Sequence, residues 1–217
     1  MLGLIFNKTK TSIYNLLFLG AHSDDIEIGC CGTILRLTEE YPNLNIIWTV
    51  FSSGDERSEE AVESANSLLV AVNEKKIVVK NFRDGFFPFS GAEIKDYFEN
   101  LKREISPDVI FTHYQHDFHQ DHRLISELTW NTFRNNFILE YEIPKYDGDL
   151  GRPNFYVQLD ESLCKKKINH LTSHFQTQSK RDWFDSDIFQ SLLRLRGMEV
   201  KSPGKFAEAF YCRKVVF

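Results

Sequence analysis

Residues 16–25, which read Leu-Leu-Phe-Leu-Gly-Ala-His-Ser-Asp-Asp, decide the fold of this chain. The first half of this stretch is a short apolar run that ends in glycine, which is typical of a strand buried on both faces of a parallel sheet. The second half places one imidazole and two carboxylates directly after that strand. Because ligands of such sheets bind beyond the carboxyl ends of the strands, this junction predicts a functional site.

Further apolar runs alternate with helical patterns along the first half of the chain. Strands are predicted at residues 45–51, 77–79 and 107–112, and helices at 32–37, 59–72 and 94–105. This alternation predicts an α/β fold: a single Rossmann-like domain over residues 1–217, with a mostly parallel sheet sandwiched by helices. The second half is less regular. There we expect strands at 137–143, 155–159 and 209–216, a helix at 165–178 and a loop at 144–153.

The composition excludes several classes of protein. The chain has 217 residues, of which 42% are hydrophobic and 26% charged, as in ordinary soluble globular proteins. A net charge of −5 argues against nucleic acid as a partner. Apolar runs are shorter than the ~20 residues of a membrane span. The four cysteines form no Cys-x-x-Cys pair, and residues 1–15 lack a signal peptide, so we expect reduced thiols and a cytoplasmic location.

A second polar cluster follows the predicted strand 107–112. It contains four histidines at a spacing of three, together with acidic residues: His113, His116, Asp117, His119, Asp121 and His122. Histidine and aspartate are suitable zinc ligands, and the two clusters fall at matching ends of parallel strands. Taken singly, each cluster has a simpler explanation, because a histidine-rich loop can be solvated and Asp24 and Asp25 could cap a helix. Together they favour one shared metal site.

The residues of both clusters resemble a known family. Residues 21–33, Ala-His-Ser-Asp-Asp-Ile-Glu-Ile-Gly-Cys-Cys-Gly-Thr, resemble the opening motif of the LmbE-like, or PIG-L superfamily, zinc-dependent N-acetylglucosamine deacetylases, which usually reads A-H-P-D-D-E-E-I-G-C-G-G-T. Residues 112–123 resemble the second motif of that family, with its H-x-D-H core. Residues 175–178 and 207–210 resemble later segments more weakly. Ser23, Ile26 and Cys31 depart from the pattern, and Cys31 in place of glycine requires a negative φ.

The resemblance implies a division of labour in the metal site. His22, Asp25 and His122 would bind Zn²⁺ as its protein ligands, which leaves one position for water. Asp24 would act as the general base towards that water.

The resemblance also implies roles around this centre. His119 would be the charged partner that steadies the oxyanion or helps the amine leave, and Asp121 would orient His119. Arg57 would contact the substrate, although a solvated charge at a helix start explains it equally well. The sequence leaves the participation of His113, His116 and Asp117 open.

The implied function is hydrolysis of the N-acetyl group of a GlcNAc-type sugar conjugate by metal-activated water. Two alternatives stay open: a non-catalytic metal- or nucleotide-binding α/β module, and a different metallohydrolase. The chain lacks a G-x-G-x-x-G phosphate loop and offers few ligands for a two-metal phosphoesterase. The sequence does not fix whether the protein is a homo-oligomer. We expect the aromatic residues of loops 83–90 and 145–154 to anchor loops or contact another copy rather than stack on a sugar.

Overall fold

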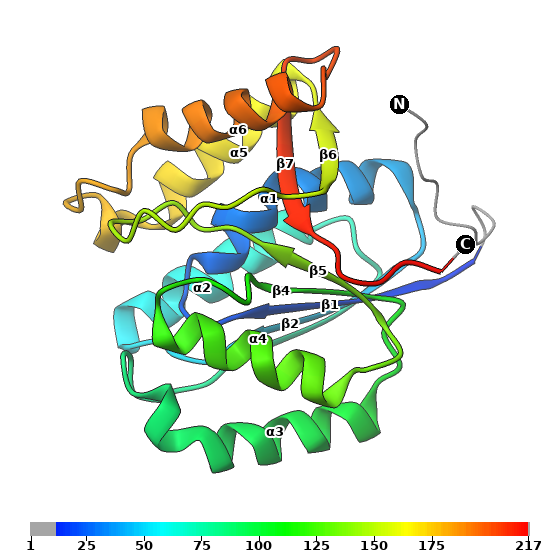
Figure 1. Cartoon of the computed structure of the whole chain (residues 1–217), viewed down its shortest axis with the longest axis vertical. Coiled ribbons are helices and arrows are strands. Elements are labelled where there is room, and N and C mark those ends of the chain that lie inside the picture. The colour runs from blue at the N-terminus through cyan, green and yellow to red at the C-terminus, as the bar shows by residue number, and fades with distance from the viewer. Residues whose placement is uncertain (1–11, 217) are drawn as a thin grey trace.

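A seven-stranded sheet in the order β3-β2-β1-β4-β5-β7-β6 forms the centre of the molecule (Figure 1). The computed structural model describes residues 12–216. The strands are β1 (Tyr14–Gly20), β2 (Leu44–Val50), β3 (Glu74–Val79), β4 (Val109–His113), β5 (Phe137–Tyr141), β6 (Phe155–Leu159) and β7 (Phe206–Tyr211). The five neighbouring strands β3, β2, β1, β4 and β5 run parallel to one another, whereas β7 runs antiparallel to both β5 and β6. The predicted mostly parallel α/β sheet is therefore confirmed.

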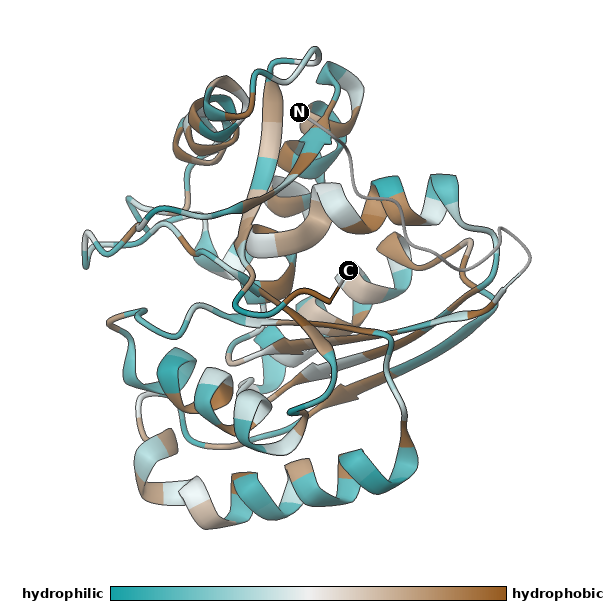
Figure 2. Ribbon diagram, turned by 45° about the vertical axis from the view of Figure 1, so that its right-hand side comes forward, coloured by the Kyte–Doolittle hydropathy of each residue, from teal (hydrophilic) through white to brown (hydrophobic). Residues whose placement is uncertain are grey.

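Helices cover both faces of the sheet. Helices α3 (Gly91–Glu104) and α4 (Gln120–Thr132) lie on one face, and α1 (Asp25–Glu40) and α2 (Asp55–Leu68) lie on the other, with α5 (Glu161–His174) and α6 (Ser186–Glu199) beside β6 and β7 (Figure 1). Side chains of β1 alternate between the two layers, because Leu17 and Leu19 pack towards α3 and α4 while Leu16 and Phe18 pack towards α1. Figure 2 shows the resulting apolar sheet between helices with hydrophilic outer surfaces.

Some boundaries differ from the prediction. Helix α2 begins at Asp55, four residues early, because its acidic first turn suits a helix N-terminus but carries no apolar periodicity. The last strand lies at 206–211 rather than 209–216, and neither α4 nor α6 was among the predicted helices. The predicted helix 165–178 is α5 followed by the 3₁₀ helix η2 (Gln176–Gln178). The prediction for residues 1–15 falls mostly on residues 1–11, which lie outside the described part. Within residues 12–216, no helix has the length and apolarity needed to cross a membrane.

A buried ion pair fixes α1 against the sheet. The Glu208 carboxylate on β7 accepts hydrogen bonds from the backbone N–H groups of Gly32 and Thr33, at 2.8 and 2.6 Å. Lys167 on α5 donates to the carbonyl of Ile28, which is the carbonyl that the N–H of Gly32 would bond in a regular α-helix. Lys167 also pairs with Glu208 at 2.6 Å. The pair thus bonds directly to the backbone of α1. The ion pair therefore holds α1, whose first turn comes directly after β1, in place.

Close packing requires small residues along the same helix. A Cβ atom on Gly29 would lie 2.4 Å from the ring of Tyr141, and one on Gly32 would lie 2.4 Å from Leu159. Cys31 lies within α1 and is not among the residues with positive φ, so the condition for replacing glycine there is met. The four cysteines are free thiols, as expected.

Candidate metal centre

The two polar clusters of the sequence meet at the carboxyl edge of the sheet. Strands β1 and β4 are parallel neighbours, with Leu16 opposite Val109 and Phe18 opposite Phe111. The turn from β1 into α1 and the segment between β4 and α4 therefore emerge side by side, at the left end of the sheet in Figure 1. The chain brings residues about 100 positions apart within hydrogen-bonding distance.

Three side-chain atoms lie at the spacing of metal ligands. His22 Nδ1 is 3.2 Å from His122 Nε2 and 3.3 Å from Asp25 Oδ2, and the last two atoms are 3.5 Å apart. Tetrahedral ligands about 2.0–2.2 Å from a metal are separated by about 3.3–3.6 Å. All three side chains are almost completely buried. The triangle therefore fits a tetrahedral metal such as zinc, with one position left over.

The pKa shifts of His22 and Asp25 favour a protonated imidazole beside an ionised carboxylate, so that their charges compensate each other. Burial favours the neutral ring, but the surrounding carboxylates, Asp25 foremost, raise the pKa of His22 well above its ordinary value. Burial would likewise raise the pKa of Asp25, but three imidazoles lower it well below the ordinary range. A metal that binds these atoms must displace protons, so its affinity depends on pH.

Asp24 and Arg57 form a pair beside the triangle. Arg57 on α2 donates from Nη2 to Asp24 Oδ1 at 3.1 Å. The second oxygen, Asp24 Oδ2, is buried and has no hydrogen-bond partner in the described residues. Burial raises the pKa of Asp24, against the opposing charge of Arg57. The arrangement leaves one carboxylate oxygen available as a proton acceptor.

His119 caps α4, and its ring is fixed by the backbone. The N–H of Asp121 donates to His119 Nδ1 at 3.3 Å, so the neutral ring carries its proton on Nε2. Burial first, and then the neighbouring rings of His122 and His22, lower the pKa of His119. Both features favour a neutral donor at this position, whereas we had expected a charged ring.

Asp121 contacts different partners from those expected. Its carboxylate accepts the N–H groups of Gly85 and Phe87, at 2.7 and 3.1 Å, and Oδ2 lies 3.4 Å from His22 Nε2. No hydrogen bond joins the carboxylate of Asp121 to the ring of His119 in the described residues. Asp121 thus holds loop 85–87 against the metal centre.

Two residues extend the site beyond the expected set. Asp117 Oδ2 accepts a hydrogen bond from His122 Nδ1 at 3.0 Å and pairs with Lys145 Nζ at 3.0 Å, which directs His122 Nε2 towards the triangle. Asp84 Oδ1 lies 3.0 Å from His22 Nε2. The position of Asp117 five residues before His122 was a usable signal, but nothing in the sequence marked Asp84 within its loop.

The histidines spaced by three do not act as one set. The ring of His113 is buried, stacks on His122 at 3.9 Å, and places Nε2 3.2 Å from Asp25 Oδ2. His116 is exposed and contacts Tyr114 instead. The segment between β4 and α4 is a turn and not a helix, so the spacing of three does not align these side chains.

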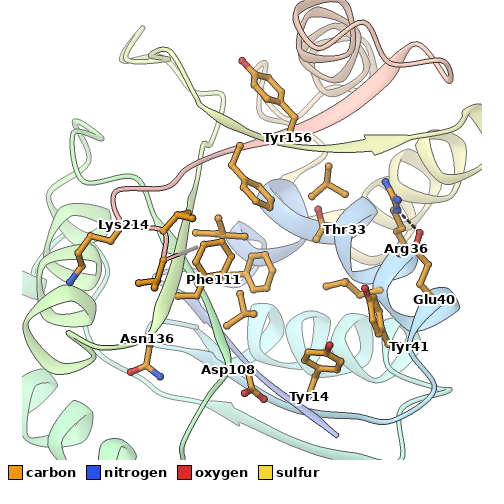
Figure 3. Close-up of a pocket in the computed structure, with 18 of the residues that line it drawn as sticks. Tyr14, Thr33, Arg36, Glu40, Tyr41, Asp108, Phe111, Asn136, Tyr156 and Lys214 are labelled. Atoms are coloured by element: carbon orange, nitrogen blue, oxygen red, sulfur yellow. Dashed lines mark hydrogen bonds and ion pairs between the residues drawn. The ribbon is translucent and has the colours of Figure 1, made fainter. Parts of the chain in front are cut away.

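A separate cavity of about 920 Å³ lies at the other edge of the sheet (Figure 3). Strand β5 pairs with β7 only through Glu140 and Tyr141, so the amino-terminal part of β5 diverges from β7 and leaves a gap. Phe111, Thr33 and Tyr156 lie around this gap. Its lining includes no histidine or cysteine, and we do not assign the metal centre to it.

The fold and the site define an α/β protein with a histidine–aspartate centre able to hold a metal at the carboxyl edge of its sheet. The family described as PIG-L, GlcNAc-PI de-N-acetylase, matches residues 17–133, and the chain belongs to this family.

One relative in sequence and two solved structures are similar to this chain. The chain is 27% identical over 175 residues to the uncharacterized deacetylase YaiS of Escherichia coli K12, which covers 77% of this chain and 92% of the relative. The N,N'-diacetylchitobiose deacetylase of Pyrococcus horikoshii has the same fold, with a TM-score of 0.71 at 23% identity over 92% of this chain and 83% of its own. So does GalB, the 4-carboxy-2-hydroxymuconate hydratase of Pseudomonas putida KT2440, with a TM-score of 0.74 at 16% identity over 94% of this chain and 98% of its own.

Proposed function

We propose that this protein is a zinc-dependent hydrolase that removes the N-acetyl group from a sugar of the N-acetylglucosamine type. The observation that carries the proposal is the triangle of His22, Asp25 and His122 beside a carboxylate oxygen of Asp24 that has no partner. The names of the family and of two relatives describe deacetylases, one of which acts on an N-acetylated sugar.

The metal would be held by His22, Asp25 and His122. When bound, zinc supplies a Lewis acid that lowers the pKa of a coordinated water and polarises the acetyl carbonyl. Asp117 accepts from the far nitrogen of His122 and so keeps its Nε2 lone pair directed inward. The donor set of two imidazoles and one carboxylate suits a catalytic zinc site.

Asp24 would move the proton. Its Oδ2 accepts a proton from the attacking water while Arg57 holds Oδ1 in place. The water oxygen forms a bond to the acetyl carbon, and the carbon–nitrogen bond breaks. Asp24 then returns the proton to the departing nitrogen, and the second proton of the water stays on the oxygen, which gives acetic acid and the free amine.

His119 would stabilise the developing charge. With Nδ1 occupied by the N–H of Asp121, the ring offers Nε2–H as a donor to the carbonyl oxygen. A neutral ring can donate through Nε2–H without taking up a second proton, unlike the charged ring implied by the family resemblance. Arg57 would act on the substrate indirectly, through Asp24, rather than as a free substrate contact.

Release of amine from a panel of N-acetylated sugars by zinc-loaded protein tests this function. We expect Asp24→Asn to keep its zinc and to lower kcat by about 10²–10⁴-fold, because it removes the base and leaves the ligands. Asp182→Asn, at an exposed carboxylate between η2 and α6, is the matched control and should keep full activity. Near-normal turnover in Asp24→Asn would refute the assignment of the base.

The GalB relative favours one rival activity, because the same fold serves a hydratase. Hydration of a carbon–carbon double bond would release neither acetate nor amine. If the metal-loaded protein frees no amine from any N-acetylated sugar, the deacetylase proposal fails. Absence of stoichiometric metal as well would favour a non-catalytic binding module.

A further inference from the structure

Five exposed apolar side chains lie on the segments that bond to residues of the metal centre, and we refer to them as the collar: Phe86, Phe89, Phe118, Tyr146 and Leu150. Their exposed fractions range from 38% to 84%. We had expected loop aromatics to anchor their loops or to contact another copy, and Phe87 anchors its loop, since it is fully buried. The collar residues do not. Large apolar side chains left in water cost free energy, and a group of them at one place marks a binding surface.

The collar lies on three segments that meet at the metal centre. Phe118 directly precedes His119. Phe86 follows Gly85, whose N–H binds the carboxylate of Asp121, and the ring of Phe89 is 5.8 Å from that of Phe86. The three segments gather at the same end of the sheet in Figure 1.

The third segment, residues 145–151, is tied to the second. Tyr146 and Leu150 lie in the same loop as Asp149. The Asp149 carboxylate accepts a hydrogen bond from the N–H of Phe118 at 2.7 Å and pairs with Lys145 at 2.5 Å. Lys145 in turn pairs with Asp117 beside the metal triangle. The collar is therefore continuous with the reacting centre and held by bonds to it.

Charges around the collar favour an uncharged ligand. Four cations at this edge are already engaged: Arg57 with Asp24, Lys145 with two aspartates, Arg123 with the carbonyls of residues 117 and 118, and the exposed Arg83 with the ring of Phe86, 3.5 Å from the ring centroid. Two carboxylates, Asp84 and Asp147, are exposed there. An anionic ligand would have to draw Arg83 away from the ring of Phe86 and would meet the charge of these carboxylates.

We propose that the substrate is an N-acetylated sugar that carries an uncharged apolar aglycone, aryl or alkyl, and that this aglycone lies on the collar. The inference rests on the proposed function, because the acetamido group must occupy the metal centre for the rest of the molecule to reach the collar. The collar then determines specificity through burial of apolar area, which lowers KM more than it raises kcat.

The ratio of kcat/KM for phenyl and methyl N-acetyl-β-glucosaminide tests this inference. In the wild type we expect phenyl to exceed methyl by about 10–50-fold, from burial of one aromatic ring. The double variant Phe89→Ser/Tyr146→Ser should bring this ratio close to one. The matched control is Leu195→Ser/Met198→Ser, which removes two exposed apolar side chains from α6 and should keep the wild-type ratio.

The outcomes separate the two proposals. Amine release from both glycosides at equal efficiency in the wild type would overturn the apolar aglycone and leave the deacetylase intact. No release from any N-acetylated sugar would overturn the deacetylase, and the aglycone with it. If Phe89→Ser/Tyr146→Ser instead dissociates an oligomer in sedimentation and keeps the ratio, the collar is a contact between copies.

Discussion

Two buried charged clusters in this molecule use similar groups but are satisfied in different ways. In the Lys167–Glu208 pair, both carboxylate oxygens accept hydrogen bonds from backbone N–H groups, and the Lys167 ammonium donates to a carboxylate and to a backbone carbonyl. In the metal centre, Asp24 Oδ2 and His113 Nδ1 are buried with no hydrogen-bond partner in the described residues. Buried polar groups are normally paired, so unpaired ones call for an explanation. The first cluster stabilises the fold, whereas the second keeps unpaired polar atoms that can interact with a metal or a substrate.

The largest expected effect is at the metal triangle. His122→Ala removes one of three ligands, and we expect the protein to lose its stoichiometric metal. His116→Ala is the matched control, because this exposed histidine lies in the same segment and outside the triangle. Metal content after dialysis, measured by elemental analysis, checks both variants. Full metal occupancy in His122→Ala would refute the assignment of the three metal ligands.

The second effect is at the structural pair. Lys167→Met leaves the Glu208 carboxylate buried without its counter-charge, which should lower the free energy of unfolding by about 3–5 kcal/mol. Lys166→Met, at the exposed neighbouring lysine that pairs with Glu39, should change it by no more than about 0.5 kcal/mol. Denaturant unfolding of the metal-free proteins gives both values.

The double variant Lys167→Met/Glu208→Gln sharpens this comparison. Removing both charges should recover part of the loss, because an unpaired buried charge costs more than its neutral replacement. A double variant that is as unstable as the sum of both single variants would mean that the pair does not interact as described.

The sequence was sufficient for the elements whose patterns are local. The apolar run of β1 and the polar turn after it gave the strand, the sheet edge and the approach of His22 to His122. Partners that depend on tertiary contacts were not readable. Asp84 reaches His22 from a loop with no pattern of its own, and Asp121 turned out to bind the N–H groups of Gly85 and Phe87.

Helix α6 escaped prediction for a similar reason. Its apolar positions, Phe189 and Leu193, alternate with polar and charged residues, and Arg196 is buried in the same helix because Glu142 pairs with it. A buried arginine breaks the apolar stripe by which a helix is recognised. Exposed Leu195 and Met198 blur the stripe further.

A smaller effect is expected at Asp117, which links the two kinds of cluster. It is fully paired like Glu208, yet one of its partners is a metal ligand. Asp117→Asn should weaken metal affinity by about 10–100-fold, because the amide orients His122 less firmly and does not raise its basicity. Asp147→Asn, at an exposed carboxylate of the loop that carries Lys145, should leave the affinity unchanged. Competition with a chelator measures both, and equal affinities in the two variants would contradict this role.

The last effect is expected at a third cluster, in which the buried Ser64 bridges Glu27 and the half-buried His170 by hydrogen bonds. Burial, and next the neighbouring His174, lower the pKa of His170 to about 4. Between pH 6.5 and 4 the unfolded chain binds a proton at this ring and the folded chain does not, so stability falls as the pH falls. The slope from this ring is at most about 1.4 kcal/mol per pH unit.

His170→Gln removes the titrating ring and keeps a side chain able to bond Ser64. Unfolding curves from pH 7 to 4 should therefore be flatter in His170→Gln than in the wild type, while His116→Gln, at an exposed ring, should follow the wild type. Parallel curves for all three proteins would mean that His170 titrates normally. This cluster would then depend on hydrogen bonds alone, unlike either charged cluster.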